Sequence, residues 1–414
     1  MKMLKLSPYY YPEQISSSHL TKDLEEAYVN EGFEIVVHAP TPTRGINQSV
    51  YNKYKHIKRE EFKNGKVVVH RFAMFREKNN LIQRATRYIL VNFLQYIKGC
   101  KEKEVSIVYG GSTPPTQGVL CGKVAAKLSK KQGKKVPFIY NLQDVFPDSL
   151  ISAGMTRKDS FLYKIGRKIE DITYRYADKI IVISEDIKKN IMNKGVPEDK
   201  IEVIYNWIDT EKVKQINMRD NQLAKELEIR DEKFRVVYAG NLGLMQGIDT
   251  LIHVAEELKD NQEIEFLIFG NGTEEKKLKE MANNLKNIRF FPLQPIERVS
   301  EVYSLGNCCV VLCRKGIGCT GVPSKTWSIM ACGRPVLVGF DRGELTQTIE
   351  YAEAGLCSEA ENISELKENI LKLSNNKELC QKMGEKARNY AVLNVDKKVI
   401  VDKYIRVLRK ILMR

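Results

Sequence analysis

The chain has 414 residues, 43% of them apolar. This is more than one hydrophobic core usually serves and predicts two domains of about 200 residues each. Its formal net charge of +15 is concentrated in residues 51–135, where 20 lysines and arginines stand against 5 acidic residues. No apolar run approaches the about 18 residues of a membrane span, residues 1–14 lack the apolar core of a signal peptide, and nine cysteines do not make a disulfide scaffold, so we expect a cytoplasmic protein.

Short β-branched runs alternate with amphipathic stretches from the first residue, which is the pattern of βαβ units and predicts a parallel sheet. Further strands are expected at 105–111, 136–142, 179–184 and 201–207. Helices are expected near 116–131, 159–177 and 185–195. We place the end of the first domain at residue 207.

Residues 80–99 predict an amphipathic helix inside the basic segment. Its apolar face holds Leu81, Ile82, Ala85, Tyr88, Ile89, Phe93 and Ile97, beside Arg84, Arg87 and Lys98. Such a helix lies either on an anionic membrane or in an ordinary core. We hypothesise that residues 51–135 dock on anionic lipid, with a solvated basic face as the alternative. Nucleic acid is not expected, because the segment lacks interleaved aromatic residues and any known nucleic-acid-binding module.

The second half repeats the pattern. A polar helix is expected over residues 209–232 as a link. Strands are expected at 234–240, 265–270, 287–292, 308–313 and 335–340. Open sheets of this type bind ligands beyond the carboxyl ends of their strands, so two facing sheets predict a ligand in the cleft between them. We assign residues 208–390 to the second domain and 391–414 to a helix that crosses back to the first.

Glycine-rich turns follow two strands of the second domain. They contain Gly240, Asn241, Gly243, Gln246 and Gly247 in the first, and Gly270, Asn271 and Gly272 in the second. Glycines before a helix let a phosphate approach exposed backbone amides, although a tight turn without a ligand is an equal alternative. Leu293 follows the next strand, where the main chain could pair with a base edge. Plain core packing of the preceding Phe290 and Phe291 is the alternative.

Residues 316–336 combine glycines, a helix start at Pro323, Ser324 and Lys325, and a helix stop at Gly333. A lysine in the first turn of a helix is electrostatically unfavourable unless an anion compensates it. The position of Lys325 therefore suggests a diphosphate ligand, with a solvated lysine as the alternative.

Together these segments resemble the retaining GT-B glycosyltransferases of family 4. The resemblance is carried by YYYPEQISSSH near the start, STPPTQG (112–118), YNLQDVFPDSL (140–150), YADKIIVIS (176–184), VIYNWID (203–209), YAGNLGLMQGIDTLI (238–252), VPSKTWSIMACGRPV (322–336) and DRGEL (341–345). It is closest to the bacterial branch that builds capsule, O-antigen and related polysaccharides, including N-acetyl-L-fucosamine transferases. It implies an α/β fold of two Rossmann-like, doubly wound domains, the first for the acceptor and the second for the donor.

The resemblance implies transfer of a sugar from a nucleotide diphosphate, here a UDP-sugar that is N-acetylated or 6-deoxy, with retention of configuration. The implied acceptor is a glycan linked to undecaprenyl diphosphate, at the inner face of the plasma membrane. No metal and no cofactor is expected, because helix amides and basic side chains stabilise the leaving diphosphate in such enzymes and no Asp-x-Asp pair is present. Lys325 would do this with Arg314 or Lys315.

The chain departs from the family at several positions. The family's two glutamates, eight residues apart, correspond to Thr320 and Ser328. Its basic pair corresponds to Asn241 and Gln246, and its first-domain glycine pair to residues 16–18, all serines. We therefore expect Lys325 to contact the diphosphate, and Ser328 or Glu344 to contact the ribose. The implied donor site is Gly240, Asn241, Gly243, Gln246, Gly270, Asn271, Gly272, Leu293, Arg314, Pro323, Ser324, Lys325, Ser328 and Glu344.

On the acceptor side, Asp144 stands in the segment QDVFPD, which resembles the family's acidic-Pro-acidic motif. We assign Asp144 and Lys325 to catalysis, the aspartate either orienting the acceptor hydroxyl or stabilising charge on the anomeric carbon; a helix-capping aspartate is the alternative. Ser17, Ser18 and His19 are expected to contact the acceptor. The other histidines, at 38, 56, 70 and 253, are expected on the surface.

Two other functions compete with sugar transfer. A non-catalytic scaffold that binds lipid-linked glycan would explain the missing glutamates. A UDP-N-acetyl sugar epimerase shares the architecture, but it would need carboxylates and histidines near the nucleotide that the sequence does not supply.

Overall fold

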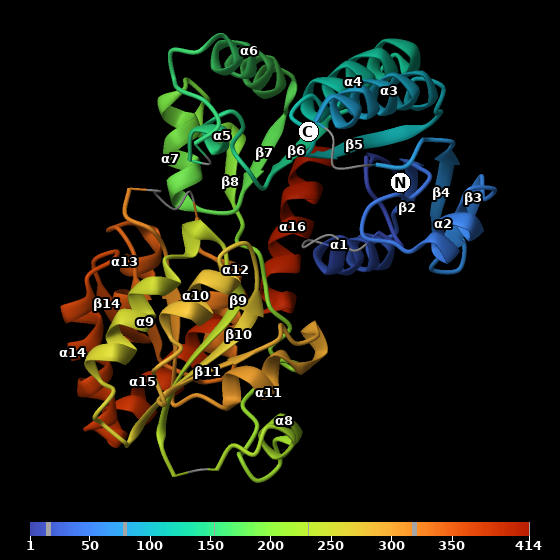
Figure 1. The fold of residues 1–414 in the computed structure, drawn as a ribbon. Helices are drawn as coiled ribbons and strands as arrows, with labels where there is room; N and C mark the ends of the chain where they lie inside the picture. The colour runs from blue at the N-terminus through green and yellow to red at the C-terminus, as the bar shows by residue number, and fades with distance from the viewer. Residues whose placement is uncertain (14–17, 78–80, 153, 231, 317–320, 414) are drawn as a thin grey trace. The chain divides into compact units, whose positions relative to one another are not determined.

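The computed structural model describes residues 1–13, 18–77, 81–152, 154–230, 232–316 and 321–413. The chain forms two compact units (Figure 1). Unit 1 contains Met1–Tyr205 and Val401–Arg414, and unit 2 contains Asn206–Ile400. The chain therefore leaves unit 1 near Tyr205 and returns to it near Val401.

Unit 1 is built on one eight-stranded sheet, in the order β3-β4-β2-β1-β5-β6-β7-β8. Its strands are β1 (Lys2–Leu6), β2 (Glu34–Pro40), β3 (Arg59–Phe62), β4 (Val67–Phe72), β5 (Val105–Gly111), β6 (Phe138–Leu142), β7 (Lys179–Val182) and β8 (Ile201–Val203). Only the edge strand β3 pairs antiparallel with its neighbour. All four residues of β7 are buried, as expected for a parallel sheet with helices on both faces.

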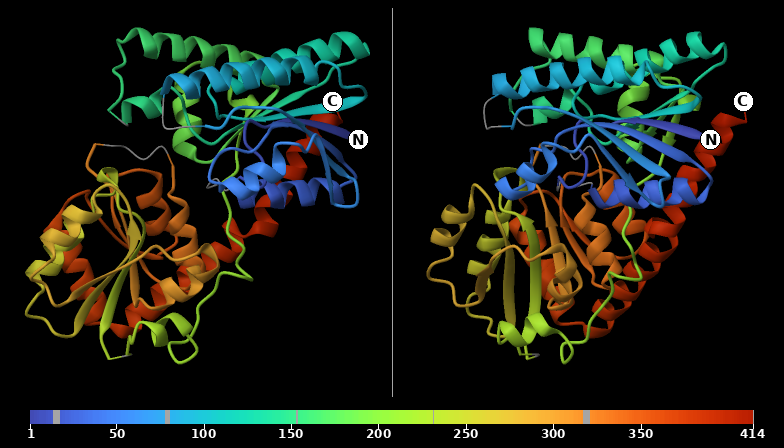
Figure 2. Two further views of the ribbon diagram at one scale, coloured as in Figure 1. Left: turned by 45° about the vertical axis from the view of Figure 1, so that its right-hand side comes forward. Right: turned by 90° about the vertical axis from the view of Figure 1, so that its right-hand side faces the viewer.

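The helices of unit 1 connect these strands. They are α1 (Ser18–Asn30), α2 (Gln48–Tyr54), α3 (Leu81–Gly99), α4 (Gln117–Gln132), α5 (Asp148–Ser152), α6 (Phe161–Tyr176), α7 (Glu185–Asn193) and the short η1 (Glu198–Lys200). Helix α4 packs between α3 and α6, and the three lie side by side on one face of the sheet (Figure 2).

Unit 2 has a six-stranded parallel sheet in the order β11-β10-β9-β12-β13-β14. Its strands are β9 (Phe234–Asn241), β10 (Ile264–Asn271), β11 (Ile288–Phe291), β12 (Cys308–Leu312), β13 (Val336–Gly339) and β14 (Gly355–Ser358). The chain adds strands on one side of β9 and then crosses to the other side at β12. The strand order thus reverses between β9 and β12, which is where open α/β sheets bind their ligands.

The helices of unit 2 include α9 and α12, which follow β9 and β12. The full set is α8 (Gln222–Glu226), η2 (Leu244–Gln246), α9 (Ile248–Glu257), α10 (Glu275–Met281), η3 (Ile296–Arg298), α11 (Val299–Ser304), α12 (Ser324–Ala331), α13 (Glu344–Tyr351), α14 (Ile363–Ser374), α15 (Lys377–Tyr390) and η4 (Ala391–Val395).

The last helix, α16 (Lys397–Leu412), begins in unit 2 and continues into unit 1. Its residue Tyr404 is 1% exposed and lies near Tyr109. Arg409 forms an ion pair with Glu31, which follows α1. The end of the chain therefore supplies part of the core of unit 1.

The strands and helices predicted in both halves are confirmed, with β8 ending at Val203 rather than at 207. The predicted link helix over residues 209–232 is wrong, because among the described residues of this range only Gln222–Glu226 are helical. The backbone amides of this segment bond to side chains instead: Lys214 N–H donates to Ser300, and Ile216 N–H donates to Ser304. These partners satisfy the backbone without a helix.

The expected surface position of the histidines is wrong for His38. This side chain is buried in β2, its Nε2 lies 2.9 Å from Glu102, and its ring stacks on His70 at 5.4 Å between centroids. Desolvation lowers the pKa of His70, and the nearby His38 lowers it further. The two rings meet because β2 and β4 pair in register at these residues.

Candidate functional site

The two glycine-rich turns of unit 2 pack against each other at the carboxyl edge of the sheet. Gly240 is opposite Gly270 in the β9–β10 pairing. Leu242 N–H donates to the Asn271 carbonyl at 2.7 Å. A Cβ on Gly270 would lie 2.3 Å from the Gly240 carbonyl oxygen, and one on Gly272 would lie 2.4 Å from the Leu242 backbone. Backbone packing therefore requires glycine at both positions.

Two helices begin close to this edge without a side-chain cap. Helix α9 follows Gly247, whose φ of 58° lies in the left-handed region that favours glycine. Helix α12 follows Pro323, and its first turn contains Lys325 but no acidic residue. Uncapped helix starts present backbone N–H groups and a partial positive charge, which suit an anion.

Lys325 is the centre of the site. Its ammonium donates to the Tyr238 hydroxyl at 3.1 Å and lies 4.3 Å from the centroid of that ring. A Cβ on Gly240 would come within 2.8 Å of the lysine Nζ, so the ammonium lies directly on the first glycine turn. Desolvation lowers the pKa of Lys325 to about 8.

No carboxylate of the described residues lies within ion-pair distance of Lys325. A desolvated cation without an anionic partner is unfavourable in a protein interior. The site therefore supplies positive charge, uncapped helix starts and close backbone approach at the point where the strand order reverses. This combination is suited to a phosphate group.

Arg314, by contrast, already has two acidic partners. Its guanidinium lies 2.7 Å from Asp249 in α9 and 2.7 Å from Glu361. These pairs tie the segment after β12 to α9. Lys315 is exposed. The predicted role of Arg314 in donor binding would require it to share its charge with a ligand.

The remaining predicted donor residues lie along the same edge. Asn241 and Asn271 end β9 and β10 and are exposed, and Gln246 belongs to η2. Leu293 is 48% exposed after β11, while Phe291 stacks on Phe269 with centroids 4.7 Å apart. This stacking agrees with the alternative that Phe291 packs in the core.

Helices α12 and α13 hold the last of these residues. Ser324 is exposed at the start of α12, and Ser328 is buried one turn after Lys325. Glu344 is buried in the first turn of α13, where a negative charge is favourable. Thr320 lies outside the described residues.

Asp144 follows β6 at the carboxyl edge of the unit 1 sheet. Its side chain is exposed and accepts hydrogen bonds from the Ser149 hydroxyl and the Val145 N–H. Desolvation raises its pKa, and these hydrogen bonds oppose that rise. Neither donor is a backbone N–H of the first turn of α5, so these contacts do not cap the helix, and the exposed carboxylate leaves room for contact with an acceptor.

The predicted acceptor contacts lie around the start of α1. Ser17 is outside the described residues. Helix α1 begins at Ser18, and the side chains of Ser18 and His19 are not described.

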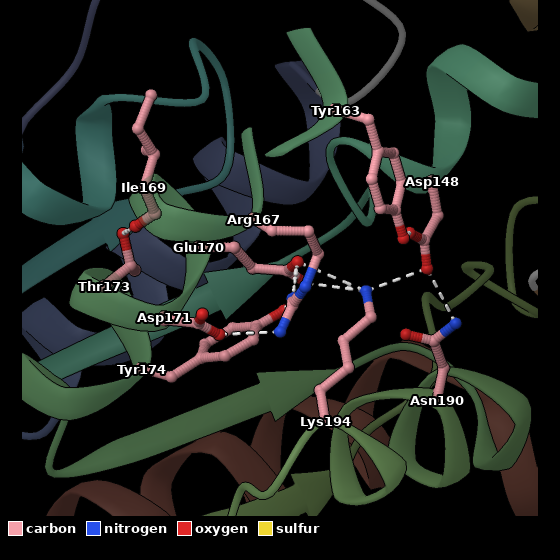
Figure 3. Close-up of polar contacts among 10 residues, drawn as sticks. All are labelled: Asp148, Tyr163, Arg167, Ile169, Glu170, Asp171, Thr173, Tyr174, Asn190 and Lys194. Carbon is pink, nitrogen blue, oxygen red and sulfur yellow. Dashed lines mark hydrogen bonds and ion pairs between the residues drawn. The ribbon is translucent and has the colours of Figure 1, made fainter. Parts of the chain in front are cut away.

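A polar network around Asp148, in the helix that follows Asp144, was missed by sequence reasoning (Figure 3). Lys194, directly after α7, lies 2.8 Å from Asp148 of α5 and 3.0 Å from Glu170 of α6. Asp148 also accepts hydrogen bonds from Asn190 and Tyr163, both at 2.9 Å. The network fixes α5, and with it the turn that carries Asp144, against α6 and α7. The only sequence signal was the acidic-Pro-acidic motif, which names Asp148 but not its distant partners.

Two further classes of site are absent from the part of the chain that the structure describes. It holds no group of three histidine, cysteine or acidic side chains placed to bind a metal ion. None of its helices combines the length and the apolar character that a membrane span needs.

Comparisons with known proteins agree with this architecture. Residues 18–212 match the model of Glycosyltransferase Family 4, and residues 220–390 match the model of Glycosyl transferases group 1. The chain is a family 4 glycosyltransferase. This glycosyltransferase is 25% identical to the putative colanic acid biosynthesis glycosyl transferase WcaI of Escherichia coli K12, over 99% of this chain and 100% of that protein.

Solved structures show the same fold for the glycosyltransferase. HepE of Anabaena in complex with UDP superposes with a TM-score of 0.71 at 15% identity, covering 99% of this chain and 100% of HepE. Sucrose-phosphate synthase of Thermosynechococcus elongatus gives a TM-score of 0.73 at 14% identity, covering 100% and 99% of the two chains. The glycosyltransferase therefore has the GT-B fold, in which each unit is Rossmann-like.

Proposed function

We propose that this glycosyltransferase takes its sugar from a UDP-sugar bound at the carboxyl edge of the unit 2 sheet. The observation that carries the proposal is the desolvated ammonium of Lys325, which lies on the Gly240 turn without a carboxylate partner among the described residues. A diphosphate would supply the missing negative charge. The UDP complex of HepE, a protein of the same fold, supports the choice of nucleotide.

In this proposal Lys325 stabilises the negative charge that grows on the leaving diphosphate, together with the backbone N–H groups at the uncapped start of α12. Metal is not required, and the reaction retains the configuration of the anomeric carbon. Asp144 keeps its predicted role in the proposal, which is to orient the acceptor hydroxyl or to stabilise charge on the anomeric carbon. The anomeric configuration of the product, determined by NMR against that of the donor, tests retention; inversion would contradict it.

The proposed acceptor is a lipid-linked glycan in the synthesis of a bacterial surface polysaccharide. The similarity to WcaI, whose name places it in colanic acid biosynthesis, supports the proposed role in polysaccharide synthesis. The surface of unit 1 supports the proposal that the acceptor is linked to a lipid. Helix α3 exposes Ile82, Ile89 and Phe93, and α6 exposes Phe161 and Leu162.

These exposed apolar side chains flank a basic helix. Helix α4 lies between α3 and α6 (Figure 2). It exposes Lys123, Lys127 and Lys130. The apolar face predicted for residues 80–99 is thus largely outside the core, since α3 buries Arg87, Val91 and Gln95 instead. Apolar residues beside lysines favour contact with the surface of an anionic membrane.

Donor binding is the decisive experiment for the proposed function. Melting the protein with UDP, GDP and TDP sugars should show a rise in the midpoint with a UDP-sugar, because a ligand that binds only the native state stabilises it. Lys325→Met should weaken binding of the diphosphate and lower kcat by about 10²-fold or more. Lys276→Met, at a lysine 91% exposed on α10, is the matched control and should leave both unchanged.

The other functions give different results in the same experiments. No shift with any nucleotide sugar would contradict the donor site. A shift without sugar transfer or donor hydrolysis in a single turnover would favour the non-catalytic scaffold. Conversion of a UDP-N-acetyl sugar into its epimer without an acceptor would favour the epimerase.

A further inference from the structure

Tyr238 connects the backbone of the first glycine turn to Lys325. Its side chain is fully buried in β9. Its hydroxyl donates to the Asn241 carbonyl at 2.7 Å and accepts from the Lys325 ammonium at 3.1 Å. A phenol has one proton to donate, and because the carbonyl takes it, the oxygen lone pairs face the lysine. The orientation of the hydroxyl is therefore set by the turn.

The lysine needs such a partner. Its four-carbon side chain is flexible, and desolvation disfavours its charged form. The face of the Tyr238 ring, 4.3 Å away, adds an attraction for the cation. Gly240, with a φ of 146°, leaves the space that the ammonium occupies. The titratable groups that face Lys325 are Tyr238 from β9 and Cys313 after β12, and no described carboxylate does so.

We propose that Tyr238 is a positioning residue that holds the Lys325 ammonium in place for the diphosphate of the donor. The inference rests on the proposed function and adds a residue that acts on the donor only through Lys325. Neither the glycine pattern nor the helix start at Pro323 pointed to this tyrosine.

The lowered pKa of Lys325 should make UDP binding depend on pH. The pKa of Lys325 in the free protein is lowered to about 8, so above this pH a growing fraction of the lysine is neutral, and binding of a diphosphate must then take up a proton. Affinity for UDP should therefore fall as pH rises through about 8. The Tyr238 hydroxyl stabilises the charged lysine, so its removal should move this fall to lower pH.

The experiment is a double-mutant cycle read out by calorimetric binding of UDP to the full chain, from about pH 6 to about pH 10. The variants are Tyr238→Phe, Lys325→Met and the two combined. Tyr238→Phe keeps the ring and should weaken UDP binding about 3- to 10-fold at pH 7. In the Lys325→Met background the same change should have no further effect. Tyr140→Phe, at a buried tyrosine of β6 in unit 1, is the control and should leave UDP binding unchanged.

Three other outcomes would contradict either this inference or the proposed function. If the wild type binds UDP and Tyr238→Phe matches its affinity and pH profile, the inference is overturned and the proposed function stands. If Tyr238→Phe costs as much in the Lys325→Met background as in the wild type, the tyrosine acts through the Asn241 turn and the inference is also overturned. If the wild type binds no nucleoside diphosphate at any pH, the proposed function itself fails.

Discussion

At the residue scale, glycine at 270 and 272 is explained by neighbouring backbone rather than by a ligand. The positions of both Cβ atoms are already taken by the turn after β9. The same two turns carry most of the predicted donor residues. Structural and functional reasons for these glycines therefore coincide, and a substitution should affect stability and donor binding together.

Gly270→Ala should lower the free energy of unfolding by about 1–3 kcal/mol, because a methyl group 2.3 Å from the Gly240 oxygen forces β9 and β10 apart at their carboxyl ends. The shift should also displace Gly240 from Lys325 and weaken UDP binding. Chemical denaturation and calorimetry measure the two effects. Gly111→Ala is the control, since a Cβ there meets nothing within 4 Å; equal effects of both changes would contradict the prediction.

Lys325 and its partner Tyr238 differ in how far the sequence reveals them. A lysine in the first turn of a helix is unusual enough to be noticed in the sequence. Its partner lies 87 residues earlier, inside a buried strand where tyrosine is an ordinary core residue. Only the pairing of β9 beside β12 brings the two together. The sequence also pointed to Arg314 as a donor-binding residue. It did not reveal the ion pairs of Arg314 with Asp249 and Glu361, because both partners lie far from it in sequence.

At the element scale, the network between α5, α6 and α7 keeps the Asp144 turn in place. Burial disfavours the charged form of Asp148, but the hydrogen bonds from Lys194, Asn190 and Tyr163 hold its pKa below the ordinary value. A lowered pKa contributes stability that is present above the ordinary pKa of about 4 and is lost as pH falls through the lower, folded-state pKa.

Lys194→Met should destabilise unit 1 by about 3 kcal/mol, since it leaves two largely buried carboxylates, Asp148 and Glu170, without their shared cation. In this variant the contribution of Asp148 to the loss of stability on acidification should be smaller than in the wild type, because its folded-state pKa rises toward or above the ordinary value. Denaturation across pH measures both effects. Lys188→Met removes the ion pair between Lys188 of the neighbouring α7 and Glu198 and should leave unfolding unchanged; an equal loss there would argue against the network.

Most strands were predictable because continuous apolar runs in a parallel sheet are buried on both faces. The edge strand β3 was not predicted, since its residues Arg59–Phe62 are mostly polar, and neither were strands β4 and β14. The prediction of a helix over residues 209–232 was wrong for another reason. Two backbone amides of this segment, those of Lys214 and Ile216, donate to Ser300 and Ser304, which lie far along the chain.

At the scale of the whole molecule, the exposed apolar side chains of α3 and α6 predict attachment to anionic membrane. In liposome flotation the protein should rise with acidic vesicles at low salt and stay behind with neutral ones. Ile89→Ser with Phe93→Ser should abolish flotation, because both side chains are more than half exposed on α3. Tyr351→Ser, at a side chain even more exposed on α13 of unit 2, is the control. Flotation that is unchanged in the double variant would contradict docking through α3.

Helix α16 has a consequence for the order in which the protein is made. Unit 2 ends at Ile400, but unit 1 is complete only when residues 401–414 have been added. Until these leave the ribosome, Tyr109 lacks Tyr404, and Glu31 lacks Arg409. The unit that begins first is therefore the last to be completed, and a nascent chain stalled just after Ile400 would hold a finished unit 2 behind a unit 1 with an open core.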